Sequence, residues 1–327
     1  MKCFNFTASR DWLYRHSFTA AGMRSLTTDL GNGTVMHCWA PKRPTTRNPT
    51  ALSSRPALVL LHGFGANAMW QYGDHLRHLT ARFDVYVPDL LFFGGSHTEA
   101  ADRSEAFQAR CVKRLLEEGH GVRRMRLVGI SYGGFVAYSM AAQFPEMVEG
   151  LVLCCTGVCL EESDMADGMF RVPDLEEAAS ILLPQTPNKL RELMRLSFVK
   201  PARVVPSCFL SDFIDVLLIS SLYYPNQPIV MCTEFVEEKR ELIQEILKGR
   251  KLSNLPKIKQ PTLIIWGDQD QIFPLELGYR LKRHLGENAE LVIIKNAGHA
   301  VNLEKPKEFL KHMKSFLVNS LSPPSKN

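Results

Sequence analysis

Short apolar segments that alternate with helical patterns limit the fold of this chain more than any other feature. Each segment is nonpolar on both faces and is followed by a polar loop, which is typical of parallel strands covered by helices on both sides. Helical patterns over 69–82 and 104–118 connect the first of them. The pattern predicts an α/β fold with a mostly parallel central sheet, with two short strands within 26–39 and further strands at 57–62, 83–90, 125–130, 151–155, 261–267 and 290–298.

This alternation is interrupted once, between Thr156 and about Pro256. The interval contains no buried strand pattern, and prolines separate its helical patterns. Because the strand series resumes afterwards, the helices must return over the same sheet as a cap or lid; a separate interaction domain is the alternative. We expect a core of residues 1–156 and 257–327 and a helical cap over residues 157–256, with helices at 174–183, 188–199, 207–221 and 233–248.

Composition narrows the functional classes. Hydrophobic residues make up 45% of the chain, charged residues 22%, and the formal net charge is +5. No basic cluster interleaved with aromatic residues is present, so nucleic-acid binding is not expected. The eight cysteines are spread without a C-x-x-C pair, which indicates a reducing compartment and neither a disulfide framework nor a zinc site.

The N-terminal segment MKCFNFTASRDWLYRHSF lacks the continuous apolar core of a secretory signal. No apolar run approaches the roughly 18 residues of a membrane-spanning helix. We therefore expect a cytoplasmic protein, and a monomer. The aromatic side chains of the N-terminal segment are expected to pack on the body of the protein; peripheral contact with a membrane surface is the open alternative.

One serine, Ser131, lies between an apolar strand pattern and a helical pattern, in Gly129-Ile130-Ser131-Tyr132-Gly133. The two glycines leave the flanks of the expected turn free of side chains. This is the G-x-S-x-G pattern of a nucleophile elbow. Such a pattern also arises by chance, and a serine hydroxyl needs a base and an orienting acid before it becomes a good nucleophile.

Residues of both kinds follow later strands. Asp268 and Asp270 come directly after the strand at 261–267, and His299 follows the last strand. Because the carboxyl ends of parallel strands meet at one edge of a sheet, Ser131, an aspartate and His299 are expected to lie close together. Their order along the chain, serine, acid and histidine, is that of the α/β-hydrolases.

Four motifs together carry a family resemblance: HGFG (62–65), GISYGG (129–134), WGDQD (266–270) and Gly-His (298–299). Over nearly all of residues 55–315 the chain resembles the α/β-hydrolase superfamily. Within it, the likeness is to the capped branch of serine esterases and monoacylglycerol-lipase-like enzymes, plant members included. The resemblance implies the α/β-hydrolase fold, with a mostly parallel sheet flanked by helices and an inserted helical cap.

The resemblance also assigns roles to residues. Ser131 would attack the substrate carbonyl, His299 would accept and return its proton, and Asp270 would orient the imidazole. The family pattern W-G-x-x-D selects Asp270 over Asp268, which would then brace the loop. Glu304, five residues after His299, is expected to cap or pair near the last helix.

Backbone groups would stabilise the oxyanion. The resemblance places the two N–H donors at Phe64 and Tyr132, the second at a helix start, where unpaired N–H groups favour negative charge. His62 is expected to brace the first loop. An apolar acyl or aromatic group would bind under the cap, for which the candidate side chains are those of Phe170, Phe209, Phe213 and Leu217.

We expect a serine hydrolase that cleaves carboxylic esters of small apolar, aromatic or acyl substrates through an acyl-enzyme, with no cofactor and no metal. Two alternatives share the fold. A carbon–carbon bond hydrolase would need additional cationic or polar groups for its acidic substrates, and a slow-turnover ligand receptor would stall after acylation. Receptors of that kind carry a G-H-S-[VM]-[SG] elbow, whereas Ile130 and Tyr132 flank the serine here.

Overall fold

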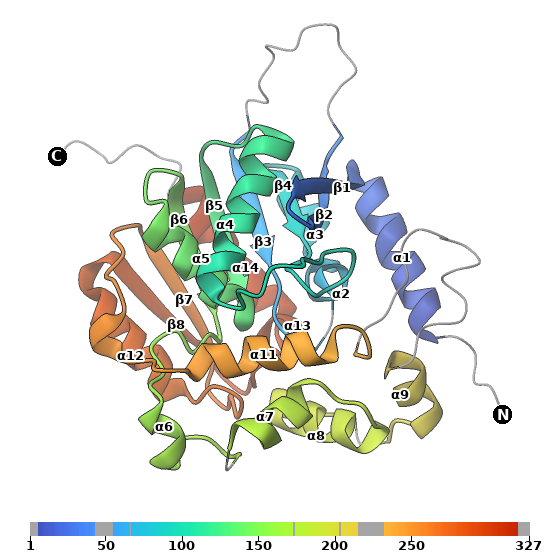
Figure 1. Ribbon diagram of the computed structural model, residues 1–327, viewed down its shortest axis with the longest axis vertical. Coiled ribbons are helices and arrows are strands. Elements are labelled where there is room, and N and C mark those ends of the chain that lie inside the picture. The colour runs from blue at the N-terminus through green and yellow to red at the C-terminus, as the bar shows by residue number, and fades with distance from the viewer. Residues whose placement is uncertain are drawn as a thin grey trace, which may run out of the picture.

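A computed structural model describes residues 6–42, 55–65, 67–172, 174–202, 204–214 and 232–319. At its centre is an eight-stranded sheet in the order β1-β2-β4-β3-β5-β6-β7-β8 (Figure 1). Strands β3 to β8 are parallel, and β1 and β2 extend one edge in antiparallel pairing. This confirms the predicted α/β fold. The strands are β1 (Met23–Gly31), β2 (Thr34–Pro41), β3 (Ala57–Leu61), β4 (Asp84–Pro88), β5 (Met125–Ile130), β6 (Val148–Cys154), β7 (Thr262–Gly267) and β8 (Ala289–Ile294).

Helices cover both faces of the sheet. In Figure 1, α4 and α5 lie in front of the strands and α14 lies behind them, and α14 contacts β7 and β8 while α5 contacts β5 and β6. Strands β3 to β7 are buried along almost their whole length, as their largely apolar sequences predict, and β8 at the edge of the sheet is partly exposed. Outside the interrupted region the helices are α1 (Phe6–Ala20), α2 (Ala68–Tyr72), α3 (Leu76–Thr80), α4 (Glu105–Arg114), α5 (Tyr132–Gln143), α12 (Leu275–Leu285), α13 (Val301–Glu304) and α14 (Pro306–Asn319), with short turns η1 (Leu115–Gly119), η2 (Leu252–Asn254) and η3 (Gly286–Asn288).

The predicted helix over 69–82 is two short helices, α2 and α3. Asn67 caps α2 by accepting a hydrogen bond from the Trp70 N–H. Gly73 separates the two helices, and a Cβ atom at this position would lie 2.2 Å from the ring of Tyr14. The close approach of α1 to this segment is therefore possible only with glycine here.

The N-terminal helix α1 was not predicted as a helix, but its packing on the body was expected. Phe18 is fully buried and its ring centroid lies 5.1 Å from that of Trp39. The outer face of α1 exposes Trp12 and Leu13. Across the part of the chain with described coordinates, no helix has the length and apolarity needed to cross a membrane.

Helices α6 (Ser163–Ala166), α7 (Leu175–Leu182), α8 (Pro187–Ser197), α9 (Ser207–Ile214) and α11 (Val236–Leu247) occupy the interval between β6 and β7. They lie together below the sheet in Figure 1, with α7 against α8 and α11, and α9 against α1. The Thr7 N–H donates to the Asp212 carboxylate across the last contact, at 2.8 Å. The four predicted helical patterns are helical where the structure describes them, and α6 was missed; residues 215–221 of the third pattern lie outside the described residues. The boundaries 157–256 stay a prediction.

The cysteines depart from expectation at one position. Buried free thiols are found at Cys38, Cys111, Cys154, Cys155, Cys159 and Cys232. Cys208, at the start of α9, is disulfide-bonded. The expectation of no disulfide framework did not foresee this bond, since spacing along the sequence does not reveal which thiols the fold brings together.

Candidate active site

Ser131 occupies a sharp turn between β5 and α5. Its backbone is in a left-handed region, with φ 52° and ψ −120°, which is uncommon for a residue with a side chain and typical of strained functional positions. A Cβ atom at Gly129 would lie 2.4 Å from the Gly133 carbonyl oxygen, and one at Gly133 would lie 2.2 Å from the Leu61 carbonyl oxygen. Gly129 is thus required for the start of α5 to lie against β5, and Gly133 for the turn to pack against β3.

The acid and the histidine meet at the same edge of the sheet. Asp270 follows β7 and His299 follows β8, and these strands are paired neighbours. The Nδ1 atom of His299 lies 2.9 Å from Oδ2 of Asp270. The other carboxylate oxygen accepts hydrogen bonds from the Ile272 and Phe273 N–H groups, both at 2.9 Å. The Asp270 side chain is fully buried, so this carboxylate is held rigidly against the imidazole.

Asp268 points away from this pair. Its Oδ1 accepts a hydrogen bond from the Ala297 N–H at 3.3 Å, and its Oδ2 lies 3.9 Å from the Lys295 ammonium. These contacts join the loop after β7 to the loop after β8. Of the two aspartates that the sequence offers, Asp270 is the one that contacts His299.

Within the described residues, no hydrogen bond joins the Ser131 hydroxyl to the His299 imidazole. Such bonds are often long in the absence of substrate. Ser131 instead faces the HGFG loop, because a Cβ atom at Gly63 would lie 2.8 Å from the Ser131 Cβ and 3.3 Å from its hydroxyl oxygen. Glycine at this position lets the loop backbone approach the serine closely.

The HGFG loop is held by two buried side chains. Gln71 accepts from the Gly63 N–H at 2.9 Å and donates to the carbonyl oxygens of Gly63 and Phe64 at 3.0 and 3.3 Å. His62 pairs through Nδ1 with the Gly63 carbonyl and through Nε2 with the Leu90 N–H. Burial lowers the pKa of His62, so a neutral imidazole fits both contacts. The expected bracing role of His62 agrees with these contacts, whereas the role of Gln71 was missed.

Phe64 and Tyr132, the two predicted oxyanion donors, lie next to each other, with ring centroids 5.1 Å apart. Tyr132 is the first residue of α5, so its N–H has no partner within the helix. In the described part of the chain the Phe64 N–H also lacks a protein acceptor. Both amides are therefore available to a developing negative charge.

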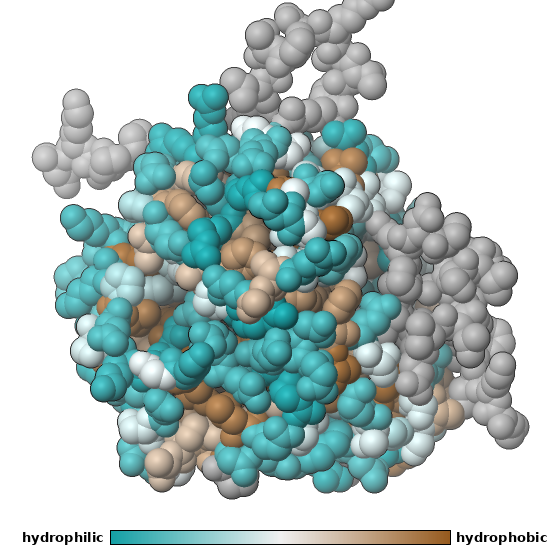
Figure 2. Space-filling view, in the orientation of Figure 1, coloured by the Kyte–Doolittle hydropathy of each residue, from teal (hydrophilic) through white to brown (hydrophobic). Residues whose placement is uncertain are grey.

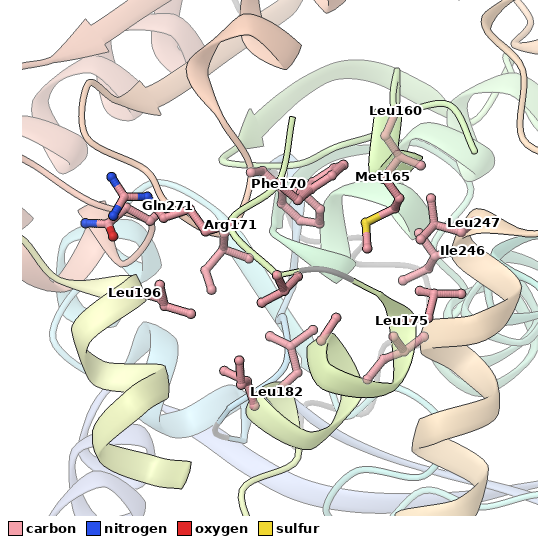
Figure 3. A pocket seen from close by; sticks show the side chains of 16 residues that line it. Leu160, Met165, Phe170, Arg171, Leu175, Leu182, Leu196, Ile246, Leu247 and Gln271 are labelled. Carbon is pink, nitrogen blue, oxygen red and sulfur yellow. The ribbon is translucent and has the colours of Figure 1, made fainter. Parts of the chain in front are cut away.

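An apolar cavity of about 80 Å³ lies beside the loop that follows Asp270. Figure 3 shows aliphatic side chains on most sides and Arg171 and Gln271 together at one end. Phe273 connects the cavity to His299, since their ring centroids are 5.6 Å apart. The lining side chains come from α7, α11 and the adjoining loops, including Phe170, Leu175, Ala178, Leu182, Ile243, Ile246, Leu247 and Ile272.

The predicted pocket residues are distributed differently from expectation. Phe170 lines this cavity, whereas Phe209 and Phe213 do not. Phe213 packs against Trp70, with ring centroids 5.4 Å apart, because α9 lies over α1 and α2 and not over the loop after β7. Leu217 lies outside the described residues.

Glu304 ties the histidine loop to helix α8. Its Oε2 accepts a hydrogen bond from the Gly298 N–H at 2.6 Å, and its Oε1 accepts one from the Val199 N–H at 2.9 Å. The Ala300 N–H adds a bond to the Ser197 carbonyl at 2.9 Å. Glu304 was expected to pair near the last helix. It also binds the residues that follow α8, more than a hundred residues earlier in the chain.

Cys155, directly after β6, completes a group of possible metal ligands with Asp270 and His299, whose ligand atoms lie within 4.8 Å of one another. Thiolate, carboxylate and imidazole are ligands that zinc accepts. Burial holds the pKa of this thiol well above its usual range, and the Asp270 and His299 atoms already bond to each other. The arrangement thus suits proton transfer through His299 better than metal binding.

Comparison with known proteins agrees with this architecture. A family model described as the alpha/beta hydrolase family matches residues 58–312. Monoacylglycerol lipase ABHD6 of Mus musculus is 30% identical over 81% of this chain and 76% of its own length. The human protein of the same name is 28% identical over the same shares.

Solved structures share the fold. A putative lipase from Acinetobacter baumannii superposes with a TM-score of 0.73 at 21% identity, covering 95% of this chain and 96% of its own. A membrane phospholipase A, described as a bacterial virulence factor, gives 0.70 at 25% identity, covering 97% and 91%. A 2-hydroxy-6-oxo-6-phenylhexa-2,4-dienoate hydrolase from Rhodococcus gives 0.65 at 21% identity, covering 91% and 99%.

Proposed function

The chain belongs to the alpha/beta hydrolase family, and we propose that it is a serine hydrolase that cleaves carboxylic esters through an acyl-enzyme intermediate. The observation that carries the proposal is the buried Asp270 carboxylate at 2.9 Å from the His299 imidazole, on the same edge of the sheet as a serine in a strained turn. A nucleophile, a base and an orienting acid at one site are the groups that acyl transfer requires.

The mechanism follows from these positions. His299 would take the proton of the Ser131 hydroxyl as the oxygen attacks the ester carbonyl. Asp270, fixed by the Ile272 and Phe273 N–H groups, would keep the second imidazole nitrogen protonated and stabilise the imidazolium. His299 would then protonate the departing alcohol, and a water molecule activated in the same way would release the acid.

The oxyanion of each tetrahedral intermediate would lie against the N–H groups of Phe64 and Tyr132. Preorganised donors of this kind contribute strongly because they need no reorientation during the reaction. Gln71 and His62 support the first donor by fixing the loop from both sides. The second donor is fixed by the start of α5.

We assign the apolar cavity beside Phe273 to an acyl or aromatic group of the substrate, and residues 157–256 to a cap. Contacts of the inserted helices with three functional loops support this role. Ile243 and Leu175 form one cluster with Phe64, α7 and α11 line the cavity, and Val199 is bonded to Glu304. The two mammalian relatives are named monoacylglycerol lipases, which directs the first substrate trials to monoacyl esters.

The test is hydrolysis of a panel of esters that vary in acyl length and in the alcohol, read as kcat/KM. Ser131→Ala and His299→Ala should each lose about 10⁴-fold or more while keeping the far-UV circular dichroism of the parent. A Ser131→Ala protein with more than a tenth of the parent activity would refute the mechanism. A burst of one product per chain without turnover would favour the receptor alternative, and cleavage of a dienolate but no ester would favour a carbon–carbon bond hydrolase. The cytoplasmic location and monomeric state stay predictions.

A further inference from the structure

Helix α11 carries a buried lysine, Lys239, on the face that it turns toward the active site. Lys239 is 2% exposed. It precedes Ile243 by one helical turn, and Ile243, Ile246 and Leu247 line the apolar cavity. Residues four and seven apart lie on one side of a helix. The lysine is therefore placed in line with the cavity wall and one turn closer to the N-terminal end of α11.

The ammonium group lies beside the aromatic cluster that covers the HGFG loop. The Lys239 Nζ is 5.0 Å from the ring centroid of Phe93. The Phe93 ring is 5.2 Å from that of Phe64 and 4.9 Å from that of His62, centroid to centroid. Burial lowers the pKa of His62, and the charge of Lys239 adds a smaller lowering that Asp89 and the Gly63 carbonyl oppose. Lys239 thus lies within electrostatic reach of the proposed oxyanion donors.

No carboxylate neutralises this charge within the described residues. The Nζ donates one hydrogen bond, to the Glu234 backbone carbonyl at 2.8 Å, and an ammonium group has three donors. Other cations with little exposure are paired with carboxylates, among them Arg126 with Glu149 and Arg280 with Asp164. Burial lowers the pKa of Lys239, and the nearby Cys232, Glu234 and Glu238 only partly offset this.

An unpaired buried cation is costly unless a partner compensates it. We propose that Lys239 binds an anionic group of the substrate, so that the preferred substrates are esters that combine an apolar arm with a carboxylate or phosphate. This inference rests on the proposed ester hydrolysis at Ser131. The apolar arm would occupy the cavity along α11 and the anion would lie at Lys239, with the ester between them.

Two pairs of matched esters test the proposal. In the first, para-(hexanoyloxy)benzoate is compared with para-(hexanoyloxy)benzamide, which places the anion in the alcohol part. In the second, the mono-para-nitrophenyl ester of adipic acid is compared with that of adipamic acid, which places it in the acyl part. The two esters of each pair have nearly the same shape and differ in charge. The phosphate analogue of the first ester, para-(hexanoyloxy)phenyl phosphate, distinguishes phosphate from carboxylate as the preferred anion.

We expect the parent protein to favour the anionic ester in at least one pair, by about tenfold or more in kcat/KM, as for a hydrogen bond to a charged group. Lys239→Met should remove this preference while the neutral ester keeps its rate within a few fold, and Lys239→Arg should retain it. Lys189→Met is the matched control, because Lys189 is a cap lysine that pairs with Glu177 at the surface.

If the parent protein hydrolyses both members of each pair equally well, the proposal is overturned before any variant is tested. An equal loss of kcat/KM on both members of a pair in Lys239→Met would also overturn it, because that result indicates a purely structural lysine. Lys239→Gln replaces the Met variant if that protein does not fold. Calorimetry on the Ser131→Ala protein compares the binding affinities of the two esters in each pair without turnover. If the parent hydrolyses no ester but Ser131→Ala binds the anionic members more tightly, only the proposed function fails.

Discussion

The imidazole of His299 and the carboxylate of Asp270 are joined by a 2.9 Å contact between Nδ1 and Oδ2, and the second oxygen of Asp270 is fully used by two backbone N–H groups. The orientation of the carboxylate is therefore set by the loop after β7 and does not depend on the histidine. Asp268 shares this loop but bonds to the Ala297 N–H. The two aspartates, separated by one residue, thus have different roles, and substituting each in turn can distinguish these roles.

Asp270→Asn should lower kcat by roughly 10⁴-fold, because an amide cannot hold the imidazole in the required tautomer or stabilise its protonated form. Asp268→Asn should lower kcat by less than about tenfold, since it weakens a loop contact without touching the imidazole. Both variants are measured on one ester at one pH. The reverse ranking would assign the acid role to Asp268.

Gln71→Leu should lower kcat by about tenfold to 10²-fold with little change in KM, because the Phe64 amide would lose the side chain that fixes its loop. Complete loss of an oxyanion donor costs about 10² to 10³ in kcat, so a displaced donor should cost less. Gln260→Leu is the control: this amide is as buried as Gln71 and bonds to the Ala141 carbonyl, but far from the loop. It should lower the melting temperature and leave kcat unchanged; equal kcat losses in both variants would contradict the role of Gln71.

Glu304→Gln should weaken the link between the histidine loop and α8. A carboxylate accepts hydrogen bonds from both the Gly298 and Val199 N–H groups, whereas an amide offers one oxygen and turns an NH₂ group toward the other donor. We expect faster hydrogen exchange at one of these two amides and a fall in kcat of about tenfold, as for a misplaced catalytic group. Glu308→Gln on the exposed side of α14 should change neither. Unchanged exchange in Glu304→Gln would show that the link is dispensable.

Asp89 and His37 form a buried pair at 2.8 Å between Oδ2 and Nδ1. Burial alone would raise the pKa of Asp89, but the contact with His37, helped by His62 and the Gly95 N–H, lowers the net pKa. A carboxyl whose pKa is lower in the folded state stabilises the fold above its unfolded pKa, and this contribution is lost as the pH falls below about 4. Asp89→Asn should therefore cost about 1–3 kcal/mol at neutral pH.

The difference between Asp89→Asn and the parent protein should shrink as the pH is lowered through the acid range, because the parent then loses the same charge. Urea unfolding of both proteins at several pH values measures this difference in the free energy of unfolding. Asp167→Asn, at an exposed position, should follow the parent curve throughout. A constant difference down to the lowest pH would show that the charge of Asp89 is not what stabilises the fold.

The sheet and the positions of Ser131, Asp270 and His299 could be predicted from sequence because each depends on local chemistry. Strands such as β3 are continuous apolar runs, and the serine turn needs glycine at two fixed positions. Lys239 was also within reach, since it falls on the same helical stripe as Leu242, Ile243 and Ile246 in α11. A lysine in phase with an apolar stripe is a signal for a buried charge.

Other features had no local signal. Gln71 reaches the HGFG loop only because α2 packs behind it, and Glu304 meets Val199 across more than a hundred residues of chain. The pairing of Cys208 and the packing of Phe213 on Trp70 likewise follow from tertiary contacts. Aromatic residues at helical spacing indicate a buried face but do not identify what that face covers. This is why, of the predicted pocket residues that the structure describes, Phe170 alone lines the observed cavity.

The cavity gives the last prediction, on substrate size. Ala178 of α7 lines it, and most of the other lining side chains are apolar. Figure 2 shows a mostly hydrophilic surface with hydrophobic side chains gathered where α11 meets α6 and α7. Ala178→Phe should fill much of the roughly 80 Å³ and lower kcat/KM for hexanoyl esters by about tenfold or more, while acetyl esters change little, because each lost methylene contact is worth about 1–3 kcal/mol. Ala166→Phe, at an exposed position on α6, controls for the added ring, and Phe213→Trp should change stability without changing this ratio, since Phe213 packs on Trp70. A uniform fall across acyl lengths in Ala178→Phe would mean that the cavity does not receive the acyl group.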